Sequence, residues 1–287
     1  MSMTQELINL LQVEPLELNL FRGISGDIGS RAVFGGQVLG QALAAAARTV
    51  EEGRGVHSLH AYFLRPGDKR APIVYDVDRI RDGSSFTTRR VVAIQHGRPI
   101  FNMSASFQVF EDGAEHADEM PDVPGPEGLT PESELLAAVI ARLPEKVRSA
   151  YERVRPIEIR PVTRFDPLAP TARPPLFTAW VRAADPLPDS PVLHQAMLAY
   201  TSDFYLLHAA LLPHAMSFFD PALHIASLDH AMWFHRPFRM DEWLLYVTES
   251  PSASNARGLC RGRFFTRDGR LVASTMQEGL IRLAPPA

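Results

Sequence analysis

The stretches SLHAYFLRP at Ser58–Pro66 and DHAMWFHRP at Asp229–Pro237 decide the fold. Aligning their Arg-Pro pairs gives an offset of 171 residues and brings aromatic residues together, with Tyr62 on Trp233. Farther along the chain, QHGRPI at Gln95–Ile100 matches RDGRLV at Arg267–Val272 at an offset of 172 residues. A repeat of this kind indicates that the chain uses one folding unit twice.

Each copy of the repeat combines a helical pattern with antiparallel strands. A tight turn containing Gly joins two alternating runs in each half, 87–94 with 100–109 and 259–266 with 271–283, which is typical of β-hairpins. Helical patterns precede these strands at 36–50 and at about 194–212. Because a helix and a sheet with one apolar face each must bury those faces together, we predict an α+β protein. Each half is then a curved antiparallel sheet wrapped around its own central helix.

The sequence between the copies has the composition of a linker. Residues 111–131 are rich in Pro, Gly, Asp and Glu, and a helical pattern follows at 131–154. We predict an N-terminal domain at 1–112, an acidic Pro-rich linker with a connecting helix at 113–154, and a C-terminal domain with the active site at 155–287. The two domains are expected to pair edge to edge, as a dimer made from one chain.

The composition excludes several classes of protein. The 287 residues are 46% apolar and 22% charged, as in ordinary globular proteins. The net charge of −4 argues against a nucleic-acid partner. The single cysteine, Cys260, allows no internal disulfide, which indicates a reducing compartment; we interpret it as a packing residue aligned with Thr88. We find no N-terminal segment in which basic residues precede an apolar stretch, as in a signal peptide, and no run of about 20 apolar residues. We therefore expect a cytoplasmic protein with no membrane partner.

Three polar residues stand out in the second half: two of them match apolar residues of the first half, and the third, a carboxylate, has no acidic equivalent there. Asp203 lies on the apolar face of the second predicted helix, which is costly for a carboxylate without hydrogen bonds. Ser227, at the start of its predicted strand, matches Val56, and Gln277, on the interior side of the last strand, matches Ala105. Each residue alone has a structural explanation, such as a helix cap or a strand start. Together they indicate one active site and one inactive site.

The sequence resembles bacterial acyl-CoA thioesterase II from about Leu10 to Arg282. The motifs that carry the resemblance are Phe34–Val38, Tyr62–Asp68, Asp229–Pro237 and Gln277–Gly279. The resemblance implies the double hotdog fold, in which each long helix is enclosed by its own sheet. It also implies that a homo-oligomer hydrolyses medium- to long-chain fatty acyl-CoA to free acid and CoA, with no metal and no organic cofactor.

The resemblance assigns the residues that hold the attacking water. In this family an Asp on the second helix, a Thr or Ser on a strand and a Gln on the last strand hold it, and the matching residues are Asp203, Ser227 and Gln277. The family's common residue at position 227 is Thr, so the serine keeps the hydroxyl and loses a methyl group, which predicts a looser side chain. We hypothesise that Asp203 is a general base for water that attacks the thioester directly, with backbone N–H groups stabilising the oxyanion.

Other features leave alternatives open. A catalytically weak acyl-CoA-binding or sensing protein on the same fold is the main one. His57, which adjoins Val56, is a candidate substrate-binding residue and an alternative catalytic residue, although histidines in both matched strands favour a structural role. Gly35 and Gly36 indicate close packing of the first helix against sheet or substrate. Because CoA is anionic, we expect basic residues near it, and the candidates on the hairpins include Arg89, Arg90 and Arg257.

Overall fold

The computed structural model describes residues 2–142 and 156–283, and its elements follow the repeat. The first half contains α1 (Met3–Leu11), β1 (Glu14–Glu17), β2 (Leu20–Gly23), α2 (Gly35–Ala47), β3 (Arg54–Phe63), β4 (Ile73–Asp82), β5 (Phe86–Gln95) and β6 (Arg98–Val109). The connection contains a 3₁₀ turn (Pro126–Gly128) and α3 (Glu132–Ile140). The second half contains β7 (Ile157–Pro161), β8 (Leu176–Ala183), α5 (Pro191–Ser202), α6 (His208–Leu211), a 3₁₀ turn (Leu212–His214), β9 (Leu223–Ser227), β10 (Asp229–Phe234), β11 (Leu244–Ser254), β12 (Arg257–Thr266) and β13 (Leu271–Leu283).

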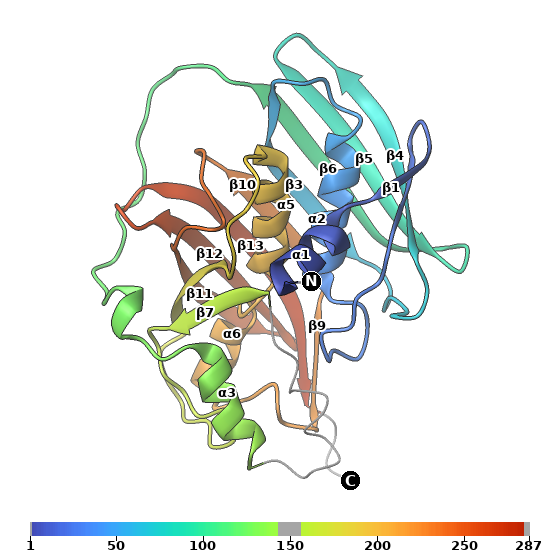
Figure 1. Cartoon of the computed structure of the whole chain (residues 1–287). Coiled ribbons are helices and arrows are strands. Elements are labelled where there is room, and N and C mark those ends of the chain that lie inside the picture. Colours follow the sequence, from blue (N-terminus) through green and yellow to red (C-terminus); the bar gives the residue numbers. More distant parts are fainter. Residues whose placement is uncertain (1, 143–155, 284–287) are drawn as a thin grey trace.

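The described strands form one antiparallel sheet in two matching halves (Figure 1). Its order is β1-β2-β4-β5-β6-β3-β10-β13-β12-β11-β8-β7, with β9 also paired to β13, and the halves join where β3 pairs with β10. His60 lies opposite Ser104, and their repeat partners Ala231 and Met276 lie opposite each other in the same register. The α+β prediction is confirmed, and the fold is a double hotdog.

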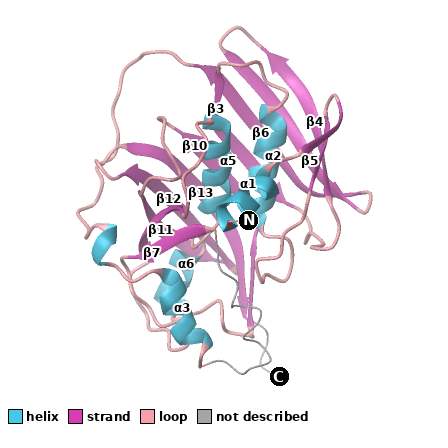
Figure 2. Ribbon diagram, in the orientation of Figure 1, coloured by secondary structure: helices cyan, strands magenta, loops and turns pink. Residues whose placement is uncertain are grey.

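The central helices α2 and α5 lie side by side against the sheet (Figure 2). A Cβ atom added at Gly36 would lie 2.3 Å from the carbonyl oxygen of Tyr200, and one at Gly40 would lie 2.9 Å from that of Ala196. Both separations are shorter than a Cβ atom tolerates, so these glycines allow the two helices to touch through their backbones. The close packing predicted for this segment is therefore packing against the other central helix.

Gly36→Ala should destabilise the protein by about 1–3 kcal/mol, because the new methyl group meets a backbone carbonyl that cannot move without shifting α5. Thermal unfolding measures the effect. Gly113→Ala is the control, since a Cβ atom there meets nothing within 4 Å. Equal melting temperatures for the two variants would show that α2 and α5 do not depend on this contact.

The second predicted helix is shorter than expected. The pattern predicted one helix over about 194–212, but α5 ends at Ser202 and a separate turn, α6, begins at His208. Tyr205 between them has a φ of +60°, a left-handed conformation that ends a helix. Asp203 is therefore the C-terminal cap of α5 and not a residue in mid-helix.

Two further expectations need correction. Ser227 does not start its strand: it is the last residue of β9, and the chain passes Leu228 before β10 begins. Cys260 lies opposite Gln277 while Arg89 lies opposite Ala105, so Cys260 corresponds to Arg89 and not to Thr88. The extra residue of the second half consequently lies in the hairpin turn.

The connection between the halves is described only in part. Of the helix predicted over 131–154, the structure shows α3 at Glu132–Ile140, and the part from residue 143 onward lies outside the described residues. Within residues 2–142 and 156–283, no helix is both long and apolar enough to cross a bilayer.

Candidate active site

Three side chains from separate elements of the second half meet at one carboxylate. The Oδ1 atom of Asp203, at the end of α5, accepts a hydrogen bond of 2.8 Å from Gln277 Nε2 on β13 and one of 3.5 Å from Ser227 Oγ at the end of β9. Because β9 pairs with β13 and Ser227 lies opposite Gly279, the serine is held two residues along the ladder from Gln277. The three residues singled out in the sequence therefore lie together.

The first half supplies a third hydrogen-bond donor to this carboxylate. The backbone N–H of Gly36 donates a hydrogen bond of 2.8 Å to Asp203 Oδ2. Gly36 lies in the first turn of α2, a helix of 13 residues whose N-terminus carries partial positive charge. A Cβ atom at Gly35 would lie 2.8 Å from the same oxygen and 3.0 Å from the Phe63 ring. The two glycines thus let the carboxylate reach the end of α2.

The surroundings prepare Asp203 to accept a proton. Burial raises its pKa above the usual range for aspartate, and the hydrogen bonds from Gln277, Gly36 and Ser227 oppose that rise. Gln277 is completely buried, and among the described residues its Oε1 atom has no hydrogen-bond partner. A carboxylate with a raised pKa beside a serine hydroxyl and an amide oxygen can orient a water molecule and remove its proton.

The matching place in the first half has no such chemistry. Val56 and Ala105, the counterparts of Ser227 and Gln277, are buried and apolar. Arg89 lies beside Ala105 with 1% of its surface exposed, and its guanidinium donates to the Thr49 hydroxyl and carbonyl and to Asp82. Since these partners inside the chain occupy the guanidinium, the expectation that Arg89 contacts CoA is wrong.

The remaining candidates lie apart from the Asp203 carboxylate. Arg90 is exposed and pairs with Asp78, and Arg257 is half-buried and pairs with Glu278. His57 lies with its Nε2 atom 2.8 Å from Ser106 Oγ and packs its ring edge-on against Phe86. Burial lowers the pKa of His57, and it makes no contact with the carboxylate in the part of the chain that the structure describes.

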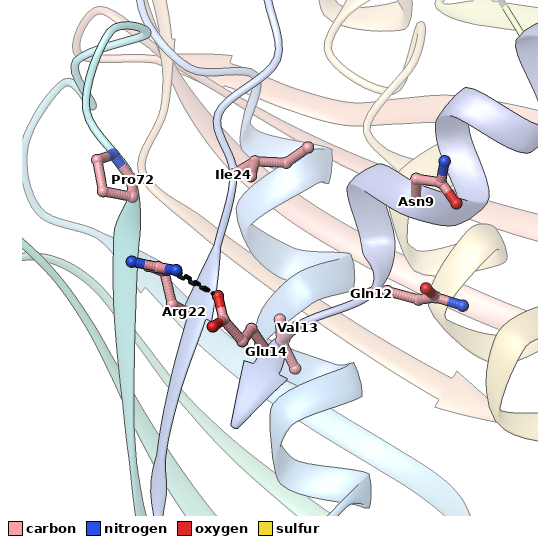
Figure 3. A pocket seen from close by; sticks show the side chains of 7 residues that line it. All are labelled: Asn9, Gln12, Val13, Glu14, Arg22, Ile24 and Pro72. Carbon is pink, nitrogen blue, oxygen red and sulfur yellow. Dashed lines mark hydrogen bonds and ion pairs between the residues drawn. The ribbon is translucent and has the colours of Figure 1, made fainter. Parts of the chain in front are cut away.

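A cavity of about 510 Å³ opens elsewhere, between α1, β2 and the chain before β4 (Figure 3). Its lining residues are Asn9, Gln12, Val13, Glu14, Arg22, Ile24 and Pro72. Arg22 and Glu14 form an exposed ion pair there, with nitrogen and oxygen 2.5 Å apart. The lining includes none of the residues that contact Asp203.

The fold and this carboxylate define the class of protein: a double hotdog whose second half carries a group suited to activating water. A family model described as acyl-CoA thioesterase matches residues 151–280, and the model of an acyl-CoA thioesterase N-terminal domain matches residues 24–108. Acyl-CoA thioesterase 2 of Haemophilus influenzae is 44% identical over 278 residues, which is 97% of each chain. The chain belongs to the acyl-CoA thioesterase II family and is a thioester hydrolase.

Solved structures agree with this placement. A crystal structure of an acyl-CoA thioesterase II, TesB2, from Mycobacterium marinum is 45% identical, covers 96% of this chain and 97% of its own, and has a TM-score of 0.78. A conserved hot dog protein from Alicyclobacillus acidocaldarius is 19% identical, covers 97% of this chain and 98% of its own, and has a TM-score of 0.76. The second likeness concerns the fold alone.

Proposed function

We propose that this chain hydrolyses medium- to long-chain fatty acyl-CoA to free fatty acid and CoA, by direct attack of a water molecule held by Asp203, Ser227 and Gln277. The observation that carries the proposal is the Asp203 carboxylate, which accepts hydrogen bonds from Gln277, Ser227 and Gly36. The relatives named acyl-CoA thioesterase support the substrate class.

The three side chains have complementary hydrogen-bonding roles toward water. The Asp203 carboxylate accepts one proton of the water, and the free amide oxygen of Gln277 accepts the other. The Ser227 hydroxyl, whose hydrogen bond to Asp203 is long at 3.5 Å, turns to donate its proton to one lone pair of the bound water. The lone pair of the water that attacks is then directed away from these three groups, toward the substrate.

The reaction forms one bond and breaks another. The water oxygen bonds to the thioester carbonyl carbon while its proton moves to Asp203, and the carbonyl oxygen becomes negative. The N-terminus of α2 stabilises that charge, and the N–H of Gly35 has no acceptor among the described residues. The carbon–sulfur bond then breaks, the electron pair leaves with the CoA thiolate, and the proton on Asp203 returns to the sulfur or to solvent.

Contacts with the CoA moiety and the assembly remain proposals. Arg90 and Arg257 are the proposed contacts for the CoA phosphates, because both guanidinium groups reach solvent. A homo-oligomer of double units and a cytoplasmic location belong to the same proposal. So does the division of the chain into domains at 1–112 and 155–287 joined by a linker.

Thiol release from acyl-CoA substrates of increasing chain length tests the substrate class, and the rate should be highest for medium or long chains. Single-turnover reactions in ¹⁸O-labelled water test the chemistry. Direct attack places the label in the free acid, with CoA and acid released together. A burst of CoA before the acid, with an acyl group trapped on the protein, would refute direct attack. A rate that is highest for the shortest acyl groups would refute the chain-length preference.

A further inference from the structure

A buried polar cluster lies directly behind Asp203, and the proposed hydrolysis uses none of its groups. His230 on β10 is completely buried. Its Nε2 atom lies 2.9 Å from Ser202 Oγ, on the last residue of α5, and 2.9 Å from Thr275 Oγ1 on β13. Ser202 immediately precedes Asp203. The imidazole, which belongs to β10, therefore connects the end of α5 to β13.

The fold does not require this cluster, because the first half does without it. Leu59 occupies the place of His230 and Met103 that of Thr275, in the same strand register, and both are buried. Buried polar groups are costly compared with apolar ones, so their presence only in the half with the carboxylate indicates a role in the chemistry.

The hydrogen bonds assign the tautomer of the imidazole. Ser202 Oγ donates to Ala199 O at 2.8 Å, and Thr275 Oγ1 donates to Ala231 O at 2.9 Å. Each hydroxyl has one proton, so both hydroxyl oxygens are acceptors toward His230, and its Nε2 atom carries the hydrogen. Burial lowers the pKa of His230 to about 3, so the ring is a neutral, fixed donor at working pH.

We propose that His230 is a positioning residue for hydrolysis: its Nε2–H, shared between Ser202 and Thr275, fixes the end of α5 and so sets the Asp203 carboxylate against Gln277 and Gly36. The inference rests on the proposed role of Asp203 as the base. The tie is needed because α5 ends at Ser202, Asp203 is its C-terminal cap, and the chain turns left-handed at Tyr205 two residues later. A misplacement of about 1 Å can cost 10²-fold in rate.

The main test is His230→Leu, which copies the first half. Ser202 and Thr275 keep their carbonyl acceptors in this variant, so no buried donor is left unpaired and the melting temperature should stay close to that of the unchanged protein. We expect kcat to fall about 10- to 100-fold with little change in KM. His230→Gln, whose amide can donate in place of Nε2–H, should recover part of kcat.

Two comparisons separate positioning from a structural role. In an Asp203→Asn background, His230→Leu should cause no further loss of activity, because there is no base left to position. Met103→Leu, a buried change at the first-half counterpart of Thr275, is the matched control and should leave kcat unchanged.

Three results would overturn the inference. The first is a kcat for His230→Leu within twofold of that of the unchanged protein, and the second is that His230→Leu lowers activity by the same factor in the Asp203→Asn background. The third is a fall in activity that a lowered melting temperature explains. Failure of the proposed function is distinguishable from these. It would show as full activity of Asp203→Asn alone, whereas an inactive Asp203→Asn with a fully active His230→Leu would defeat only the positioning role.

Discussion

Asp203→Asn should lower kcat for acyl-CoA hydrolysis by about 10²- to 10⁴-fold and leave the protein at least as stable at neutral pH. An amide cannot take a proton from water, so the base is lost. The hydrogen bonds to the side chain at position 203 are retained. The Asn oxygen can accept from the Gly36 N–H. Its amide can donate to Gln277 Oε1 after that side chain turns over.

The pH dependence follows from the raised pKa of Asp203. Activity of the unchanged protein should fall as pH drops through this pKa, because the base becomes protonated. The free energy of unfolding depends on pH in the opposite direction. A carboxyl group whose pKa is raised by folding stabilises the folded state when it is protonated, and this stabilisation is lost as pH rises through the folded pKa. The stability advantage of Asp203→Asn should therefore grow from acidic to neutral pH.

Thiol release and thermal unfolding, each followed across pH, measure the two effects. Asp189→Asn is the matched control, because that carboxylate is 94% exposed and its removal should change neither activity nor stability appreciably. If Asp203→Asn kept more than about a tenth of the activity, Asp203 would not be the general base.

The repeat made most of the fold predictable. Two Arg-Pro pairs and two Gly turns aligned the strands, and the observed register of Ala231 opposite Met276 reproduces that of His60 opposite Ser104. The end of α5 was not predictable from periodicity. The apolar positions continue through Leu206, Leu207 and Ala210, yet the helix stops because Ser202 and its neighbours bond to the sheet and Tyr205 turns left-handed. Those partners are distant in sequence.

The site was predictable where side chains differ between the halves and not where the backbone acts. Asp203, Ser227 and Gln277 are visible as polar residues whose counterparts are apolar or absent. The donor from Gly36 is a main-chain group, and no residue type marks it. The prediction that Arg89 contacts CoA was wrong because a charged residue on a strand suggests an exposed side chain, whereas Arg89 is buried beside Ala105. The glycine pair in FGGQV was the available indication that a group would approach α2 closely.

Gln277→Glu should lower kcat/KM roughly 10²-fold at neutral pH, and part of the loss should be regained at alkaline pH. The change keeps the shape of a completely buried side chain but places a second carboxyl at 2.8 Å from Asp203. Two carboxyl groups this close do not both ionise at neutral pH, so they share one proton and titrate as a pair with one raised pKa. At neutral pH the shared proton occupies the base, and at higher pH its loss restores a carboxylate that can accept a proton from water.

The pH profile of kcat/KM, compared with that of Gln277→Ala, tests this explanation. Gln277→Ala also removes the hydrogen bond to Asp203 but adds no carboxyl, so its loss should persist at alkaline pH. Stability should also differ, because the shared proton favours the folded state of Gln277→Glu and its contribution disappears as pH rises through the raised pKa of the pair. Parallel activity profiles for the two variants would mean that Gln277 does not act on the charge of Asp203, and the water would then have to be held by other groups.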